Sequence, residues 1–127
     1  MTTEILIVAL TLMLECRGEP FVGKVLVGEV IANRANQFGT TPAKVCLATR
    51  QFSAWNKTSL KKAKRLIGTE GWEDCVIIAT SISQPGYVPI SPATHFANLS
   101  LCRPRWARKM RRVAVSGNHA FFAPKGK

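Results

Sequence analysis

The clearest pattern in the chain is a run of apolar residues from Ile5 to Leu14, which only Thr11 interrupts. A helix that is apolar on every side is usually buried in a protein core. The pattern therefore predicts a core helix over about residues 3–16, which Gly18 and Pro20 bring to an end. The run is too short to span a lipid bilayer.

Shorter helical patterns follow, separated by turn residues. We expect helices at about residues 23–36, 41–48, 59–67 and 72–83, and a last helix that begins at Arg103. In the first of these, Val27, Val30, Ile31 and Arg34 share one face, which is typical of a helix packed on a core. In the last, Trp106 and Met110 share one side.

Turn signals fill the segments between the expected helices. Residues 84–92 contain three prolines and a glycine, which predicts a surface loop or at most a short hairpin. Residues 117–119 predict a turn before residues 120–122 return to the core. The whole pattern predicts one mainly α-helical domain over residues 1–127, with room for a small β-hairpin.

Glu15 is the first candidate for chemistry, because it directly follows the apolar run. Partial burial would disfavour the charged form of its carboxyl group. The negative end of the helix dipole would disfavour that form again. Both effects would raise the pKa of Glu15 and keep a proton available near neutral pH, as a general acid requires.

Glu19 is the second acid of this segment, and the chain has only seven acids in all. Glu15 and Glu19 would share a helix face if the helix continued, although Gly18 and Pro20 favour its ending. Two interpretations of Glu19 stay open. It either pairs with Glu15 or caps the next helix. We expect Glu19 to be a support or a substrate-binding residue rather than a partner in catalysis.

Two further segments carry candidate substrate-binding residues. In residues 52–55 we expect Phe52 in the core and Trp55 in a cleft, where an aromatic face suits a sugar ring and Ser53 could orient it. Two core anchors are the alternative for the aromatic pair. In residues 93–98 we expect His95 to bind substrate, with a structural histidine as the alternative. We also expect Asn98, which lies on the opposite face of the segment, to bind substrate.

The net charge of +11 is unevenly distributed, with eight basic residues and no acid between Leu101 and Lys127. A second basic block lies at residues 57–65. Such surfaces attract nucleic acid, anionic lipid or the anionic polymers of a bacterial envelope. A solvated basic face with no partner is the alternative for either block.

The remaining composition narrows the function classes. Cys16, Cys46, Cys75 and Cys102 are spaced unlike zinc ligands, and the two histidines lack companions at ligand spacing, so we predict no metal and no cofactor. We expect Cys46 and Cys75 to be buried. No basic segment precedes the apolar run, as a signal peptide would require, so we expect synthesis in the cytoplasm with reduced cysteines.

Five segments in order resemble the SleB-like cell-wall hydrolase family, which includes spore-cortex-lytic enzymes and phage lysins. Residues 15–20 are similar to its E-A-R-G-E-P, and residues 23–34 to its G-x-V-A-V-x-x-V-I-x-N-R. Residues 51–55 are similar to Q-F-S-x-W, residues 93–96 to A-T-H-Y, and residues 117–122 to G-x-H-x-F-Y. Two departures are Cys16 in place of Ala, and Ala97 where many members carry a second His or Tyr.

The resemblance implies a lysozyme-like fold, cleavage of the glycan strands of peptidoglycan, and Glu15 as the catalytic acid. Because acids are scarce, we favour a lytic transglycosylase in which Glu15 is acid and then base. A hydrolytic muramidase that uses Glu15 with Glu19 is the alternative, and a zinc amidase lacks its ligands. Family habit further implies a phage endolysin that is released through a holin. We expect a monomer, and from the charge we expect its basic C-terminal segment to hold it on the anionic envelope.

A nucleic-acid-binding protein is the rival from another class, because the same basic surface would serve it. That interpretation explains the charge, but neither Glu15 at the end of a core helix nor the order of the five segments. We therefore expect no specific nucleic-acid partner.

Overall fold

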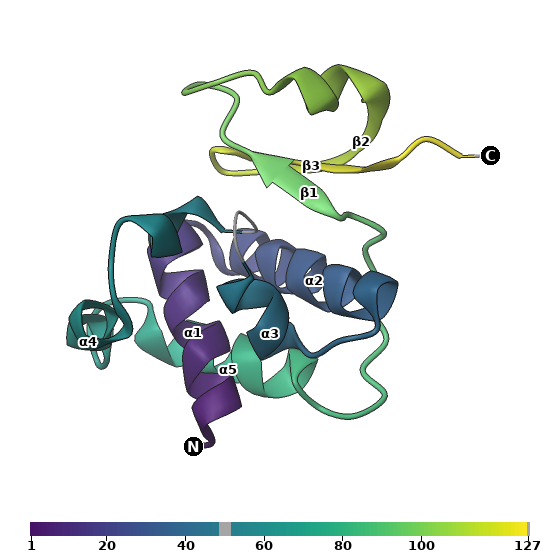
Figure 1. The fold of residues 1–127 in the computed structure, drawn as a ribbon. Helices are drawn as coiled ribbons and strands as arrows, with labels where there is room; N and C mark the ends of the chain where they lie inside the picture. Colours follow the sequence, from purple (N-terminus) through teal and green to yellow (C-terminus); the bar gives the residue numbers. More distant parts are fainter. Residues whose placement is uncertain (49–51, 127) are drawn as a thin grey trace.

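The computed structural model describes residues 1–48 and 52–126. Its α-helices are α1 (Thr3–Cys16), α2 (Phe21–Phe38), α3 (Pro42–Leu47), α4 (Leu60–Ala63) and α5 (Trp72–Ile82), and its strands are β1 (His95–Ala97), β2 (Met110–Ser116) and β3 (His119–Pro124). Three 3-10 helices complete it, η1 (Ser53–Asn56), η2 (Lys64–Leu66) and η3 (Arg105–Lys109). The helices form one layer and the small sheet lies over them, with the segment that leads to β2 on its outer side (Figure 1).

The first helix has the predicted bounds, Thr3–Cys16. The hydroxyl of Thr2 accepts the backbone N–H of Ile5 at 3.2 Å and caps its first turn. The second helix is longer than predicted and ends at Gly39, whose φ of +61° closes the helix in the left-handed region. Along the described ranges, 1–48 and 52–126, no helix is long and apolar enough to cross a membrane.

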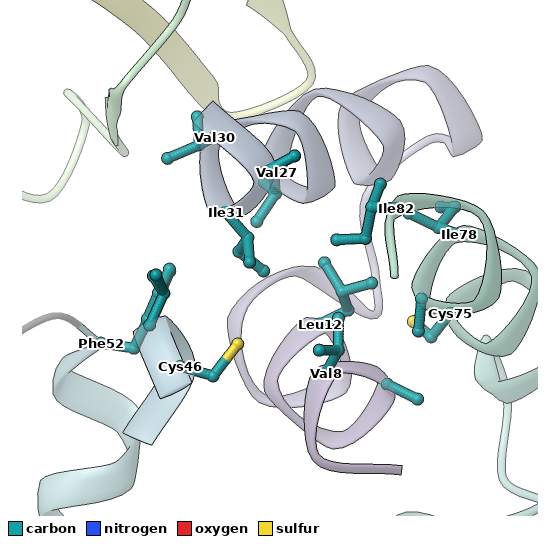
Figure 2. Close-up of a cluster of buried hydrophobic side chains, with 14 of the residues drawn as sticks. Val8, Leu12, Val27, Val30, Ile31, Cys46, Phe52, Cys75, Ile78 and Ile82 are labelled. Atoms are coloured by element: carbon teal, nitrogen blue, oxygen red, sulfur yellow. The ribbon is translucent and has the colours of Figure 1, made fainter. Parts of the chain in front are cut away.

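The core lies where α1 packs against the other helices. Figure 2 shows α1 with Cys46 of α3 on one side and Cys75 of α5 on the other, and both cysteines are fully buried as predicted. A Cβ at Gly28 of α2 would lie 2.6 Å from Cγ2 of Ile78, so the glycine lets α2 and α5 approach closely. Burial of this cluster fixes the direction of α1, whose C-terminal end points toward the sheet (Figure 1).

The sheet replaces the last predicted helix. Only Arg105–Lys109 is helical, and the chain then extends into β2. The strand order is β1-β3-β2, all antiparallel, and the small hairpin is formed by β2 and β3 around Gly117 rather than by residues 84–92, which form a loop. The prediction of a helix from Arg103 was wrong because pairing with β3 decides the conformation of the following residues.

The central strand β3 is buried on both faces. Phe121 faces the helical core and is fully buried. Phe122 points the other way and meets the ring of Trp106 edge-on, with 5.3 Å between ring centroids. The segment before β2 therefore covers the outer face of the sheet, and the predicted return of residues 120–122 to the core is confirmed.

Two short predicted helices are confirmed in part. Thr41 caps α3, and its hydroxyl accepts the backbone N–H of Lys44 at 3.3 Å. Ser59 caps α4 in the same way, but that helix is one turn long and continues as η2. The turn predicted at residues 51–55 is η1, and Gln51 lies outside the described residues.

Candidate active site

A cleft of about 610 Å³ opens between the C-terminal end of α1 and the sheet. Its lining includes Glu15, Glu19, Arg34, Phe52, Ser53, Phe96, Asn98, Trp106 and His119. A second pocket of about 430 Å³ shares Arg34, Ser53, Phe96 and Trp106 with it, and extends the same groove to Gln37, Phe38 and His95. The two pockets make one elongated depression, which is the shape that a polymer strand requires.

Glu15 lies half-buried at the last turn of α1. Burial raises the pKa of its carboxyl group above the ordinary value of 4.5. A hydrogen bond from the backbone N–H of Ala54 and the positive charge of Arg34 both lower that pKa, but the effect of burial is larger. The sequence predicted a raised pKa for Glu15, and the structure gives the same direction. The contacts with Ala54 and Arg34, which lower this pKa, were not evident in the sequence.

Arg34 comes from α2 and reaches the cleft instead of packing in the core. Its Nε donates to the carbonyl oxygen of Thr94 at 2.7 Å, and its guanidinium carbon lies 5.2 Å from the centroid of the Phe52 ring. Burial lowers the pKa of the guanidinium, and Glu15 is the largest of the effects that raise it. A cation therefore faces Glu15 across the cleft. An arginine on an otherwise apolar helix face was the signal that the sequence offered.

Glu19 is held by the turn between β2 and β3. Its Oε1 accepts the backbone N–H of Asn118 at 2.8 Å and its Oε2 accepts the side-chain Nδ2 of Asn118 at 3.0 Å. The interpretation of Glu19 as a helix cap was wrong, because Pro20 occupies the cap position of α2 and makes no side-chain cap. Although Glu19 lines the cleft beside Glu15, its side chain is only 11% exposed and both oxygens are occupied.

Apart from Trp55, the other residues predicted to bind substrate lie in two adjoining pockets rather than in one. Ser53 and Asn98 line the cleft with Glu15, while His95 lines the adjoining pocket. The His95 ring lies 4.9 Å from that of Trp106, and its Nδ1 is 3.0 Å from the hydroxyl of Thr94. Burial and then the charge of Arg34 lower the pKa of His95.

Trp55 does not line the cleft, which corrects the expectation from the sequence. Its indole N–H donates to Oγ1 of Thr11 at 2.8 Å, so the ring packs against the core beside α1. Phe52 is buried as predicted, and one face of its ring also forms part of the cleft wall. The alternative of two core anchors thus describes the position of both aromatic residues.

The cleft residues that were not expected from the sequence include Arg34, Trp106 and His119. His119 is buried, and its ring meets Phe96 and Phe121 edge-on at 5.2 and 6.2 Å. Burial lowers the pKa of His119, and the Glu19 carboxylate opposes that effect. No local pattern marked Trp106 as a cleft residue.

Two polar residues of α2 fix the loop that leads to β1. The buried carboxylate of Glu29 accepts the Tyr87 hydroxyl at 2.7 Å and the backbone N–H groups of Ile90 and Ser91 at 2.9 and 2.8 Å. Asn33 donates through Nδ2 to the carbonyl oxygens of Ser91 and Ala93 at 2.7 and 2.8 Å. These bonds place β1 beside α2 and so build one wall of the cleft.

The described ranges contain no group of three or more His, Cys, Asp or Glu residues that could hold a metal ion. Cys16 is buried beside Glu15 and donates through Sγ to the carbonyl oxygen of Leu12 at 3.3 Å. Burial raises the pKa of Cys16, and raises that of Cys46 to about 12 and that of Cys75 to about 11. These three thiols are therefore poor nucleophiles at neutral pH.

Comparisons with known proteins indicate that the chain is an enzyme. A model of the Cell Wall Hydrolase family matches residues 18–122. The catalytic domain of the germination-specific lytic transglycosylase SleB from Bacillus anthracis is similar in structure, with a TM-score of 0.73 and 26% sequence identity over 96% of this chain and 95% of that one. A comparison with curated proteins found no match.

The fold and the family match define a lysozyme-like, mainly α-helical enzyme that cleaves the glycan of the cell wall. The chain belongs to the Cell Wall Hydrolase family and is SleB-like within it, so peptidoglycan degradation is its activity. The matched residues begin after Glu15, so the match does not extend to that carboxyl group.

Proposed function

We propose that this enzyme cleaves the bond between N-acetylmuramic acid and N-acetylglucosamine as a lytic transglycosylase, with Glu15 as its single acid and base. The observation that carries the proposal is the state of the two cleft carboxyl groups. Glu15 is available and has a raised pKa, while both oxygens of Glu19 are bound by Asn118.

The reaction needs one proton carrier. Protonated Glu15 donates to the glycosidic oxygen, and the bond to the muramic acid breaks with its electron pair on that oxygen. The neighbouring N-acetyl group of the substrate stabilises the positive charge left on the sugar. The Glu15 carboxylate then removes the proton of the primary hydroxyl of the same sugar, whose oxygen attacks the anomeric carbon and closes an anhydro ring. No water is consumed.

A hydrolytic route needs a second carboxylate that is free to act. Two-carboxylate glycosidases place the second group as a nucleophile or as a base for water. Among the described residues that line the cleft, Glu15 and Glu19 are the acids, and Glu19 already accepts two hydrogen bonds. Glu29, the other buried acid, accepts three and lies outside the cleft. The arrangement supports the one-acid route.

The first prediction removes the proton carrier. Glu15→Gln keeps the size of the side chain, and we expect it to lower the rate of wall lysis by roughly a hundredfold to ten-thousandfold, the usual contribution of general acid-base catalysis. The matched control is Glu4→Gln, which neutralises an exposed acid at the opposite end of α1. Clearing of purified sacculi measures both rates. A folded Glu15→Gln protein with the activity of Glu4→Gln would contradict the proposal.

The biological setting is a separate proposal. The phage endolysin role and release through a holin stay predictions, and expression in host cells with and without a holin tests them. Lysis that depends on the holin would support the role, and equal lysis without it would contradict the role.

A further inference from the structure

A separate pocket of about 310 Å³, lined by arginines, lies on the outer face of the sheet beside the cleft. Three arginines line it, Arg103, Arg108 and Arg112, over an apolar floor of Leu99, Met110 and Phe122. Pro104 lines both this pocket and the main cleft, so the two hollows meet at one residue. Arg103 and Arg108 lie in the segment that covers the sheet in Figure 1, and Arg112 lies in strand β2.

The three arginines lack protein carboxylates. Asp74 is the last acid in the chain, so residues 75–127 contain none. Within the described ranges, Lys24 forms an ion pair with Asp74, Nδ1 of His119 lies 3.9 Å from Oε1 of Glu19, and no arginine of this pocket lies within ion-pair distance of a carboxylate. All three are exposed at the rim, while the floor beneath them is apolar. Three guanidinium groups around one hollow therefore form a site for anions.

We propose that this pocket binds the carboxylates of the stem peptide that each muramic acid of peptidoglycan carries. The inference rests on the proposed function, because it places the glycan strand in the adjoining cleft. The amide-linked glycan repeat is uncharged, so the carboxylates of the substrate lie on its peptide. Arginine forks bind carboxylates through two parallel hydrogen bonds, and the apolar floor suits the methyl groups of alanine in the same peptide.

The test compares two triple variants on two substrates. Arg103, Arg108 and Arg112 are changed to Gln in one variant. In the matched control Lys61, Lys62 and Lys64 are changed to Gln, which removes the same charge from an exposed segment far along the chain. The substrates are sacculi freed of phosphate polymers, and the same glycan strands after an amidase has removed their peptides and the exposed lactyl carboxylates of the muramic acids have been converted to methyl amides.

We expect the arginine variant to lose about tenfold or more in kcat/KM on peptide-bearing strands, as loss of charged hydrogen bonds implies. It should keep the wild-type rate on stripped strands, and the lysine variant should keep both rates. Equal losses in the two variants would mean general attraction to the wall and would overturn the inference. So would an equal loss on stripped strands, or a loss that appears only when phosphate polymers are left on the wall.

Two further results keep the test decisive. If the Gln variant does not fold, the triple Arg→Lys variant replaces it. Lysine keeps the positive charge but cannot form the two parallel hydrogen bonds of a guanidinium group. We expect this variant also to lose activity on peptide-bearing strands and to keep it on stripped strands. Wild-type protein that cleaves neither substrate would instead contradict the proposed function. The two failures are therefore distinguishable.

An independent observation concerns Thr11, the one polar residue in the apolar run, which lies one helical turn before Glu15. Thr11 is fully buried, its hydroxyl donates to the carbonyl oxygen of Ile7 at 2.8 Å, and it accepts the indole N–H of Trp55 at 2.8 Å. Trp55 belongs to η1, and the residue before it is Ala54, whose backbone N–H bonds to Glu15. We infer that Thr11 and Trp55 are positioning residues that hold η1 against α1 and so hold Ala54 at the Glu15 carboxyl group.

The charged and titratable groups around Glu15 are few. They are Arg34 of α2, Cys46 of α3, and Cys16, Arg17 and Glu19 beside the end of α1, with His119 of β3 across the cleft. Thr11→Val removes the hydroxyl and keeps the shape. Among these groups it directly changes the Cys46 thiol, which also hydrogen-bonds to Thr11, and burial keeps that thiol uncharged by raising its pKa to about 12. If the Thr11–Trp55 bond holds Ala54 in place, the variant weakens a contact that favours charged Glu15, and the pKa of Glu15 rises.

The measurement is the pH titration of the Glu15 carboxyl carbon by NMR, which needs no activity and so stays informative if the proposed function fails. We expect an upward shift in Thr11→Val and in Trp55→Phe, and the wild-type titration in Thr11→Ser, which keeps the hydroxyl. In the same two variants, the pH at which kcat falls on the basic side of its pH profile should rise with the pKa of Glu15, while KM changes little. A fall in melting temperature with an unmoved Glu15 titration would overturn the inference.

Discussion

At the scale of single residues, the surroundings of Glu15 disfavour the charged form of its carboxyl group. The largest effect on its pKa is burial, and the Ala54 N–H and Arg34 only partly offset it. Between pH 4.5, the ordinary value, and the raised pKa, the folded protein binds a proton that the unfolded chain has released. Stability from this group therefore falls as pH rises through that interval and stays low above it.

This sign gives a second prediction for Glu15→Gln. The variant should be more stable than the wild type at neutral pH, because it removes the cost of charging a buried carboxyl group. The difference should vanish below about pH 4.5, where the wild-type group is protonated in both states. Thermal unfolding across this pH range measures it. The raised pKa of Glu15 would be contradicted if the stability of the variant relative to the wild type were lower at neutral pH than at acid pH.

At the scale of elements, the sequence predicted what depends on local pattern. The bounds of α1 follow from its apolar run, and the caps Thr41 and Ser59 follow from their hydroxyls. The strand β2 was missed because Trp106 and Met110 have helical spacing, while its real conformation depends on pairing with β3. The cleft was predicted at Glu15, Ser53 and Asn98, but not at Arg34 or His119, because only the folded chain brings α2 and β3 to the end of α1.

The contact between Glu19 and the hairpin turn supplies the element-scale prediction. Gly117 has a φ of +55°, and a Cβ there would clash with Oε1 of Glu19. Gly117→Ala should therefore lower the free energy of unfolding by about 1–3 kcal/mol. Urea unfolding measures the loss. The control Gly39→Ala has a similar left-handed φ of +61° but places its Cβ in open space, so equal losses in the two variants would show that the turn is not constrained by Glu19.

At the scale of the whole molecule, acidic and basic residues are unevenly distributed along the chain. The last acidic residue is Asp74, so every charged side chain in the part that forms the sheet is basic. The cleft meets this basic half at its rim, where Pro104 and Trp106 line the opening. An anionic envelope would therefore attract the protein through the same side that presents the cleft.

This distribution predicts a lysis rate that depends on salt. The screening length falls from about 10 Å at 0.1 M salt to about 3 Å at 1 M, so attraction to the envelope weakens as salt is added. The rate of lysis of whole envelopes should fall steeply over this range, while cleavage of short uncharged glycan oligomers should change little. Turbidity and product release measure the two rates. Equal salt dependence, or none, would exclude a role for the basic half in holding the wall.

The claim that one carboxyl group performs the whole reaction is tested most directly by the product. Purified sacculi are digested in isotope-labelled water, and the released muropeptides are analysed by mass spectrometry. The account predicts anhydro-muramic ends that contain no label, because the sugar's own hydroxyl closes the ring. Reducing ends that carry one labelled oxygen from water would contradict it and would mean that a second group activates water in this cleft.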